Sequence, residues 1–209
     1  MKIFVCARSL GEFEFINSVK LFCGGFDNVK TTIQGILDLD VDAIVAPANS
    51  FCEMSGGIDL HYKNYLGSRI ETDIQHLIAD KYHGELLVGQ AEAVKIVTDN
   101  TNIKAKYVIF APTMRVPEYV GHTINSFLAA KAALLKAEEL GLESVAIPGL
   151  GTGTGGMKPE DFAKQLAEAI RYVLIDKKHL KNPKNLYEEQ EFVRGIAPVT
   201  WHKLHIVTD

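Results

Sequence analysis

The glycine-rich sequence PGLGTGTGGMKPED, at residues 148–161, constrains the fold more than any other segment of the chain. It begins within an apolar run, SVAIPGL at 144–150, which has the length and composition of a buried strand. It leads into Pro159, Glu160 and Asp161, which are typical of the first turn of a helix. A buried strand, a tight turn and a helix in this order predict an α/β fold with parallel strands.

The rest of the chain continues this alternation of apolar runs and segments with helical spacing. Further strands are predicted at residues 2–8, 29–36, 42–48, 91–98 and 107–112. Helices are predicted in three places: before Gly24, from Thr123 to Leu140, and from Pro159 onward. The second of these helices is expected to bury a broad apolar face made of Ile124, Phe127, Leu128, Leu134, Leu135 and Leu140. We therefore expect a three-layer α/β/α domain around a mixed, mostly parallel central sheet.

The chain is expected to form one domain over residues 1–209, with a polar surface excursion at 177–198 before a possible last strand. Hydrophobic residues make up 47% of the sequence, which suffices for a sizeable core. The 22 basic and 26 acidic residues include no basic run, so nucleic acid is not an expected partner. The sequence leaves the oligomeric state open.

The sequence also indicates where in the cell the protein resides. No apolar run approaches the roughly 20 residues of a membrane span, and the N-terminus lacks the pattern of a signal peptide. Cys6, Cys23 and Cys52 are widely spaced with no CxxC pair, which favours reduced thiols over a disulfide framework or a zinc site. We expect a cytoplasmic protein without membrane association and without a bound metal.

The turn at 149–156 is interpreted as an anion-binding loop. Glycine permits positive φ and has no side chain, so successive backbone N–H groups can converge on one anion. The N-terminus of the following helix adds positive potential. We expect a phosphate or diphosphate to contact Gly149, Leu150, Gly151, Thr152, Gly153, Thr154, Gly155 and Gly156. The alternative is a glycine-rich turn that binds nothing.

Two other phosphate-binding motifs fit this loop poorly. A Walker A loop requires lysine and then serine or threonine directly after its last glycine, whereas Met157, Lys158 and Pro159 follow here. Three of the glycines match the pattern GxGxxG. A dinucleotide fingerprint, however, belongs to the first βαβ unit of its domain, and only about 50 residues follow this loop.

A second loop of interest lies in VDAIVAPANSFCEMSGGIDLHY at 41–62, where Asn49 follows an apolar strand and Asp59 comes ten residues later. With AKYVIFAP at 105–112 and SVAIPGLGTGTGG at 144–156, in the same order and at similar spacing, this loop resembles the macro-domain family. The likeness extends over most of the chain. The motifs PANSF, SGGID, LLVGQA, APTMRVP and PGLGTGTGGM are more closely similar to a macro-like branch of that family.

The resemblance implies a cleft for ADP-ribose at the carboxyl ends of the strands. It places the diphosphate against the loop at 149–156 and against the turn formed by Gly56, Gly57 and Ile58. Asn49 matches the asparagine that holds the distal ribose, and Asp59 matches the aspartate that hydrolases of the family place beside it. An amide can fix ribose hydroxyls, and a carboxylate can orient or deprotonate a water molecule.

Asp59 and the neighbouring histidine also have simpler interpretations. A carboxylate just after a glycine turn can act only as a helix N-cap, which is the alternative role for Asp59. His61 is interpreted as a structural surface histidine rather than a base.

Two positions depart from the family pattern. The aspartate that accepts from the adenine amino group falls on Gly35, and neither Asp38 nor Asp40, which lie close by, matches that position. We therefore expect relaxed selectivity for adenine. The family's aromatic residue in the phosphate loop falls on Gly155, so that end of the cleft is expected to be more open.

These observations predict that the protein binds ADP-ribose or a related nucleotide. They further predict hydrolysis of an ADP-ribosyl ester, of the mono-ADP-ribosyl or O-acetyl-ADP-ribose type, with Asn49 and Asp59 as the catalytic residues. The alternative function is a non-catalytic reader module for ADP-ribose or a nucleotide. A third, a dinucleotide-dependent oxidoreductase, depends on the GxGxxG match alone. The first two require no metal and no other cofactor.

Overall fold

The computed structural model describes residues 1–9, 11–175, 192 and 195–197. The strands are β1 (Lys2–Cys6), β2 (Val29–Thr32), β3 (Ala43–Ala46), β4 (Glu92–Lys95), β5 (Tyr107–Phe110) and β6 (Ser144–Ile147). The α-helices are α1 (Phe13–Cys23), α2 (Gly57–Leu66), α3 (Arg69–Tyr82), α4 (Asn125–Glu139) and α5 (Pro159–Ile170). A short 3-10 helix, η1 (Ile36–Asp38), follows β2, and a π-helical turn, η2 (Arg171–Ile175), continues α5.

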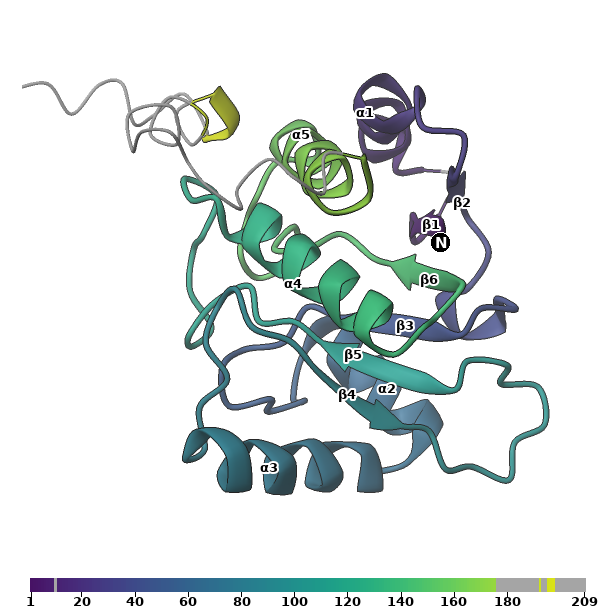
Figure 1. The fold of residues 1–209 in the computed structure, drawn as a ribbon, viewed down its shortest axis with the longest axis vertical. Helices are drawn as coiled ribbons and strands as arrows, with labels where there is room; N and C mark the ends of the chain where they lie inside the picture. Colours follow the sequence, from purple (N-terminus) through teal and green to yellow (C-terminus); the bar gives the residue numbers. More distant parts are fainter. Residues whose placement is uncertain (10, 176–191, 193–194, 198–209) are drawn as a thin grey trace, which may run out of the picture.

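The six strands form one sheet in the order β2-β1-β6-β3-β5-β4 (Figure 1). Neighbouring strands are parallel except for β4, which runs antiparallel to β5 at the edge of the sheet. The predicted α/β fold with a mixed, mostly parallel sheet is therefore confirmed. The inner strands consist almost entirely of apolar residues because both of their faces are covered by helices.

Alternate residues of each strand face opposite helical layers. In β6, Val145 and Ile147 belong to the core beneath α1, α4 and α5, whereas Ala146 belongs to the core beneath α2 and α3. Figure 1 shows α1, α4 and α5 on one side of the sheet and α2 and α3 on the other. This arrangement is the predicted three-layer α/β/α architecture.

The structure differs from the prediction in its helices. The helix α4 packs on the core through Phe127 and Leu134 of the predicted apolar face and through alanines such as Ala129 and Ala133. Leu135 and Leu140 are 46% and 38% exposed, so the prediction was wrong for these two leucines. Small residues let α4 lie close to the sheet and to α5, which leaves those two leucines at its margin. The helix α3, which packs its inner face on the sheet through isoleucines, was not predicted from the sequence.

The strands are also shorter than predicted. The strand predicted at 29–36 ends at Thr32 and gives way to η1. Most of the predicted excursion at 177–198, and the possible last strand after it, lie outside the described residues. Phe192 and Ile196, which are described, pack against the core beside α4, so that stretch does not lie wholly on the surface.

Asp42 links three strands at the amino-terminal edge of the sheet. Its carboxylate accepts hydrogen bonds from the backbone N–H groups of Glu143 and Ser144, both at 3.0 Å, and pairs with Lys106 at 2.8 Å. Bonds from Lys106, Glu143 and Ser144 lower the pKa of Asp42 below its usual value. The start of β3 is thereby fixed against the starts of β6 and β5.

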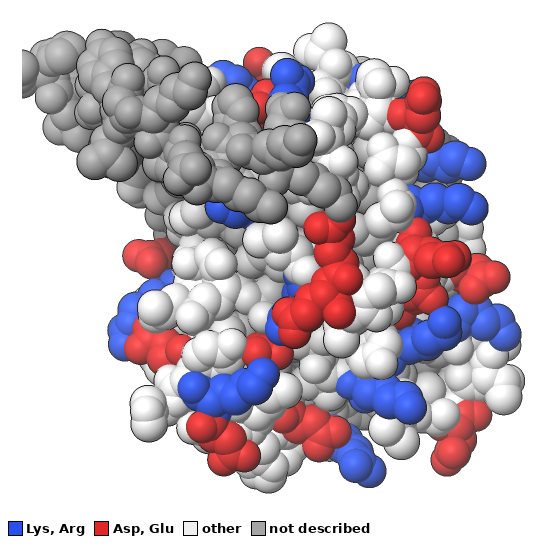
Figure 2. Space-filling model, viewed as in Figure 1, with Lys and Arg blue, Asp and Glu red and all other residues white. Residues whose placement is uncertain are grey.

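Surface charge is mixed over the face in Figure 2, where basic and acidic side chains are interspersed. Within the described part of the chain, no helix combines the length and the apolar character needed to cross a membrane. The same residues contain no group of three or more histidine, cysteine, aspartate or glutamate side chains placed to hold a metal ion.

We expect Asp42→Ala to lower the free energy of unfolding by about 2 kcal/mol, because it removes several hydrogen bonds to one partly buried carboxylate. The matched control is Lys106→Met, which removes only the exposed ion pair and should cost less than about 1 kcal/mol. Because the folded-state pKa of Asp42 is lowered, its stabilisation is present at neutral pH and is lost as the pH falls below about 4. Urea denaturation measures both variants, and equal losses would contradict the linking role of Asp42.

Candidate functional site

A cleft of about 740 Å³ opens at the carboxyl ends of the central strands. Its walls come from the segments that follow β1, β2, β3, β5 and β6, together with the start of α2. Parallel strands all end at the same edge of a sheet, so loops that are far apart in sequence converge there. The cleft lies where the sequence predicted a binding site.

Most of the predicted site residues line this cleft: Asn49, Gly56, Gly57, Ile58, Asp59, Gly149, Gly151, Thr152, Gly153, Thr154 and Gly155. Two predicted residues do not. The side chain of Leu150 is fully buried beneath the loop, and its carbonyl accepts a bond of 2.6 Å from Ser126. Gly156 turns away from the cleft, and the Tyr119 ring occupies the space beside it.

The glycine loop presents backbone donors that have no protein acceptor. Among the hydrogen bonds of the described residues, none uses the N–H groups of residues 151–155, all of which line the cleft. Buried or cleft-facing backbone donors are normally paired, so a consecutive unpaired set favours an anionic ligand.

The glycines of this loop serve different geometric purposes. Positive φ occurs at Gly151 (73°) and Gly156 (62°). Gly153 has no positive φ, so the backbone conformation does not require a glycine there. A side chain at Gly155 would collide with the Gly151 carbonyl and with Val120, each 2.6 Å from the Cβ position. Packing against Val120 and the Gly151 carbonyl therefore requires glycine at position 155, while the more open end of the cleft stays a prediction.

The N-terminus of α2 adds a second set of donors. Gly56 is the N-cap, no side chain caps the helix, and the first turn begins with the bond from Leu60 N–H to the Gly56 carbonyl. The N–H groups of residues 57–59 have no acceptor among the described residues and lie on the cleft wall. The positive end of the helix dipole strengthens this set.

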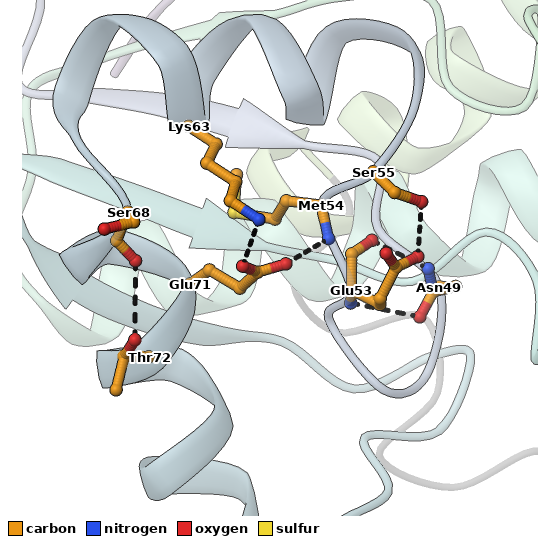
Figure 3. Close-up of polar contacts among 8 residues, drawn as sticks. All are labelled: Asn49, Glu53, Met54, Ser55, Lys63, Ser68, Glu71 and Thr72. Atoms are coloured by element: carbon orange, nitrogen blue, oxygen red, sulfur yellow. Dashed lines mark hydrogen bonds and ion pairs between the residues drawn. The ribbon is translucent and has the colours of Figure 1, made fainter.

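Asn49 organises the loop between β3 and α2 (Figure 3). Its Oδ1 accepts from the N–H groups of Phe51 at 3.0 Å and Glu53 at 3.3 Å, and its Nδ2 donates to the Glu53 carbonyl at 2.9 Å. These bonds use both acceptor positions and one of the two amide hydrogens. One hydrogen remains for a ligand.

Asp59 is a buried carboxylate with an unpartnered oxygen. It is the third residue of α2, and its Oδ1 has no hydrogen-bond partner in the structure. Burial, and secondarily the negative charge of Glu53, raise the pKa of Asp59 from 3.8 to about 7. Because Gly56 is the N-cap and no side chain bonds to the cap, the interpretation of Asp59 as only a helix cap is wrong.

The other candidate groups have less favourable chemistry. Cys6 lines the cleft and Cys52 lies behind it, but burial raises the pKa of each thiol to about 12, so neither supplies a thiolate at neutral pH. His61 is exposed at the cleft wall with its ring 6.1 Å from that of Tyr65.

Several residues that line the cleft were not predicted from the sequence. Glu53 lies between the motifs PANSF and SGGID of the second loop, Ser55 is the first residue of SGGID, and the Ser55 hydroxyl donates to the Glu53 carboxylate at 2.7 Å. Arg8 and Glu12 reach the cleft from the segment after β1 and form an ion pair. Arg8 and Glu12 could have been predicted only from the fact that they follow β1, a parallel strand next to β6. The sequence does not reveal this order of strands.

The wall around Gly35 carries a carboxylate from another residue. A Cβ at Gly35 would lie 2.5 Å from the Asp38 Oδ2, so Asp38 occupies the space that a side chain at position 35 would enter. The turn of η1 brings the two residues together, and Gln34 donates to the Asp38 carbonyl at 2.8 Å. The Asp38 carboxylate therefore lies beside Gly35, the position at which the family pattern has its aspartate.

Known proteins share this fold and its sequence pattern. The Macro domain family model matches residues 45–166, a range that contains both loops. An uncharacterized protein of Aeropyrum pernix is 37% identical over 158 residues, which cover 71% of this chain and 78% of that protein. The macrodomain of Mycobacterium tuberculosis DarG matches with a TM-score of 0.56 and 26% identity, over 68% of this chain and 89% of that one. A mutant of the Oceanobacillus iheyensis macrodomain with ADPR matches with a TM-score of 0.56 and 18% identity, over 65% and 72% of the two chains.

We expect Asp59→Asn to raise the free energy of unfolding by on the order of 3 kcal/mol at about pH 8, because the folded protein buries an unpaired charge there. The pKa of Asp59 is higher in the folded than in the unfolded protein. Its unfavourable contribution to the free energy of unfolding is therefore smallest at a pH below 3.8, the pKa of the unfolded state. The penalty grows as the pH rises and is complete above about 7.

Urea denaturation at about pH 4 and about pH 8 measures this effect. Asp73→Asn, which alters a more exposed carboxylate on α3, is the control and should change stability little at either pH. A wild type at least as stable as Asp59→Asn at about pH 8 would contradict the raised pKa.

Proposed function

Since the chain belongs to the Macro domain family, whose model matches residues 45–166, we propose that it binds ADP-ribose or a related nucleotide in the cleft and hydrolyses an ADP-ribosyl ester. One observation carries the binding proposal: the unpartnered N–H groups at 151–155 and 57–59 line one cleft. A diphosphate supplies enough acceptor oxygens to engage both sets. The macrodomain of Oceanobacillus iheyensis with ADPR, which shares the fold, supports the choice of ligand.

The ester linkage lies next to Asp59 in this proposal. Asn49 uses its remaining amide hydrogen to hold a hydroxyl of the distal ribose, and its other bonds keep the amide in place. Asp59, which lines the cleft and forms no hydrogen bond through its buried Oδ1, accepts a proton from the attacking water through its carboxylate. A pKa of about 7 suits a general base at neutral pH, since the carboxylate is both present and basic there. The substrates are of the mono-ADP-ribosyl or O-acetyl-ADP-ribose type, and the reaction needs no metal.

The second candidate function is a non-catalytic reader of ADP-ribose or a nucleotide. The three internal hydrogen bonds of Asn49 favour it, because an amide that holds its own loop can organise the cleft without contacting the ribose. Asp59 would then only shape the cleft. Turnover separates the two candidates, whereas binding is common to both.

We expect Gly153→Val to lower the affinity for ADP-ribose by about 100-fold or more, the scale of losing two charge-assisted hydrogen bonds. The fold should be retained, because Gly153 has no positive φ and an added Cβ meets no atom within 4 Å. Gly25→Val is the matched control, since that glycine has equally open surroundings but lies outside the cleft. Titration calorimetry with ADP-ribose measures both, and undiminished affinity in a folded Gly153→Val protein would remove the loop from the binding site.

We expect Asp59→Ala to lower the turnover of an ADP-ribosyl ester by roughly 100-fold, the usual scale for one acid-base group, while affinity changes less. Asn49→Ala should lower both affinity and turnover, because the ribose and the loop lose their support. Released ADP-ribose is measured from O-acetyl-ADP-ribose and from an ADP-ribosylated protein, with Asp73→Ala as the control. Equal turnover by the wild type and Asp59→Ala would leave the reader function as the better proposal.

A further inference from the structure

Two carboxylates share one region of the cleft. Glu53 and Asp59 both line it, one from the loop after β3 and the other from the first turn of α2. They interact electrostatically. Ser55 donates to Oε2 of Glu53 and fixes the orientation of that side chain toward the loop (Figure 3). The Asp59 Oδ1 is buried without a hydrogen-bond partner.

No cation neutralises this pair from within the cleft. Among the described residues, Arg8 is the single lysine or arginine on the cleft wall, and its guanidinium is bound to Glu12. Lys63 lies on the other side of the loop, where it pairs with Glu71 (Figure 3). The loop between β3 and α2 therefore separates its nearest lysine from the two carboxylates.

The other titratable groups around Asp59 leave its charge uncompensated. The Cys52 thiol, on the loop, and the Tyr62 hydroxyl, on α2, both have a pKa raised by burial and are neutral at physiological pH. The Tyr62 hydroxyl donates to the Val45 carbonyl rather than to Asp59. His61, also on α2, stands exposed at the cleft wall.

The cleft thus carries groups of opposite electrostatic preference. Unpaired N–H groups at 151–155 and 57–59 attract an anion, whereas Glu53 and Asp59 repel one. We propose that Glu53 is a specificity-determining residue: with Asp59 it excludes anionic groups from the reacting end of the cleft and restricts the substrate to ADP-ribose whose distal ribose carries an uncharged or cationic group. This inference rests on the proposed function, because it takes the end beside Asp59 to hold the distal ribose.

The same repulsion acts on the products of ester hydrolysis. Addition of water across a neutral ester gives an alcohol and a carboxylic acid, and the acid releases its proton to solvent at neutral pH. The resulting anion arises beside Glu53 and is repelled from the cleft. The carboxylate pair therefore admits the uncharged ester and expels the charged acid.

Two ADP-ribose derivatives test the proposal by direct binding. One carries a methoxy group and the other a phosphate at the anomeric carbon of the distal ribose, so they differ in charge as well as in size at that position. We expect the wild type at about pH 8 to bind the methyl derivative nearly as well as ADP-ribose and the phosphate derivative about 10-fold more weakly or worse. Higher salt should reduce the difference.

Glu53→Gln keeps the size of the side chain and removes its charge. We expect it to reduce the discrimination between the two derivatives by about 5-fold or more while ADP-ribose affinity changes little. Asp73→Asn removes a carboxylate outside the cleft and should leave the discrimination unchanged. Thermal melts establish that both variants are folded.

The outcomes separate this inference from the proposed function. If the wild type binds ADP-ribose and binds both derivatives equally, the charge exclusion is overturned and ADP-ribose binding stands. If Glu53→Gln discriminates as strongly as the wild type, the role of Glu53 is overturned. If the wild type binds no ADP-ribose at all, the proposed function fails and this inference fails with it.

Discussion

The parallel pairing of β1, β6, β3 and β5 is the constraint on which the rest of the structure depends. Strands covered on both faces must be apolar throughout, so they carry no functional groups themselves. Their carboxyl ends all lie at one edge, and the loops that leave this edge meet around one cleft. The opposite edge is held by Asp42, which connects three strands by hydrogen bonds and an ion pair. Asp42 thus fixes the amino-terminal edge of the sheet, whereas the irregular loops that form the cleft lie at the carboxyl-terminal edge.

The cleft contains hydrogen-bond donors and an acceptor that have no partner among the described residues. Backbone donors at 151–155 and 57–59 have no acceptor among the described residues, and Asp59 has an oxygen without a donor. The Asp59 oxygen destabilises the folded chain, because it is buried away from water without gaining a partner. A ligand with a diphosphate would supply acceptors for the backbone donors. The surrounding core supplies the stability that this arrangement requires.

The loop that carries Glu53 and Ser55 is fixed from inside and from behind. Asn49 holds it from inside through three hydrogen bonds. From behind, Glu71 on α3 accepts from the Met54 N–H at 2.7 Å and pairs with Lys63 on α2 (Figure 3). A helix that does not line the cleft therefore contributes to the geometry of the site. Such support limits the rearrangement that a ligand must induce.

The sequence by itself determined the elements whose signals are local. Continuous apolar runs predicted the buried strands, and the glycines of 149–156 predicted a turn with accessible backbone donors. The resemblance to the macro-domain family singled out Asn49 and Asp59, and both line the cleft. Tertiary structure decided what depends on partners distant in sequence: the approach of Arg8 to the cleft, the filling of space beside Gly155 by Val120, and the alanine contacts of α4. It also decided the chemistry of Asp59, because a pKa reflects burial and neighbouring charge, and neither exists until the chain has folded.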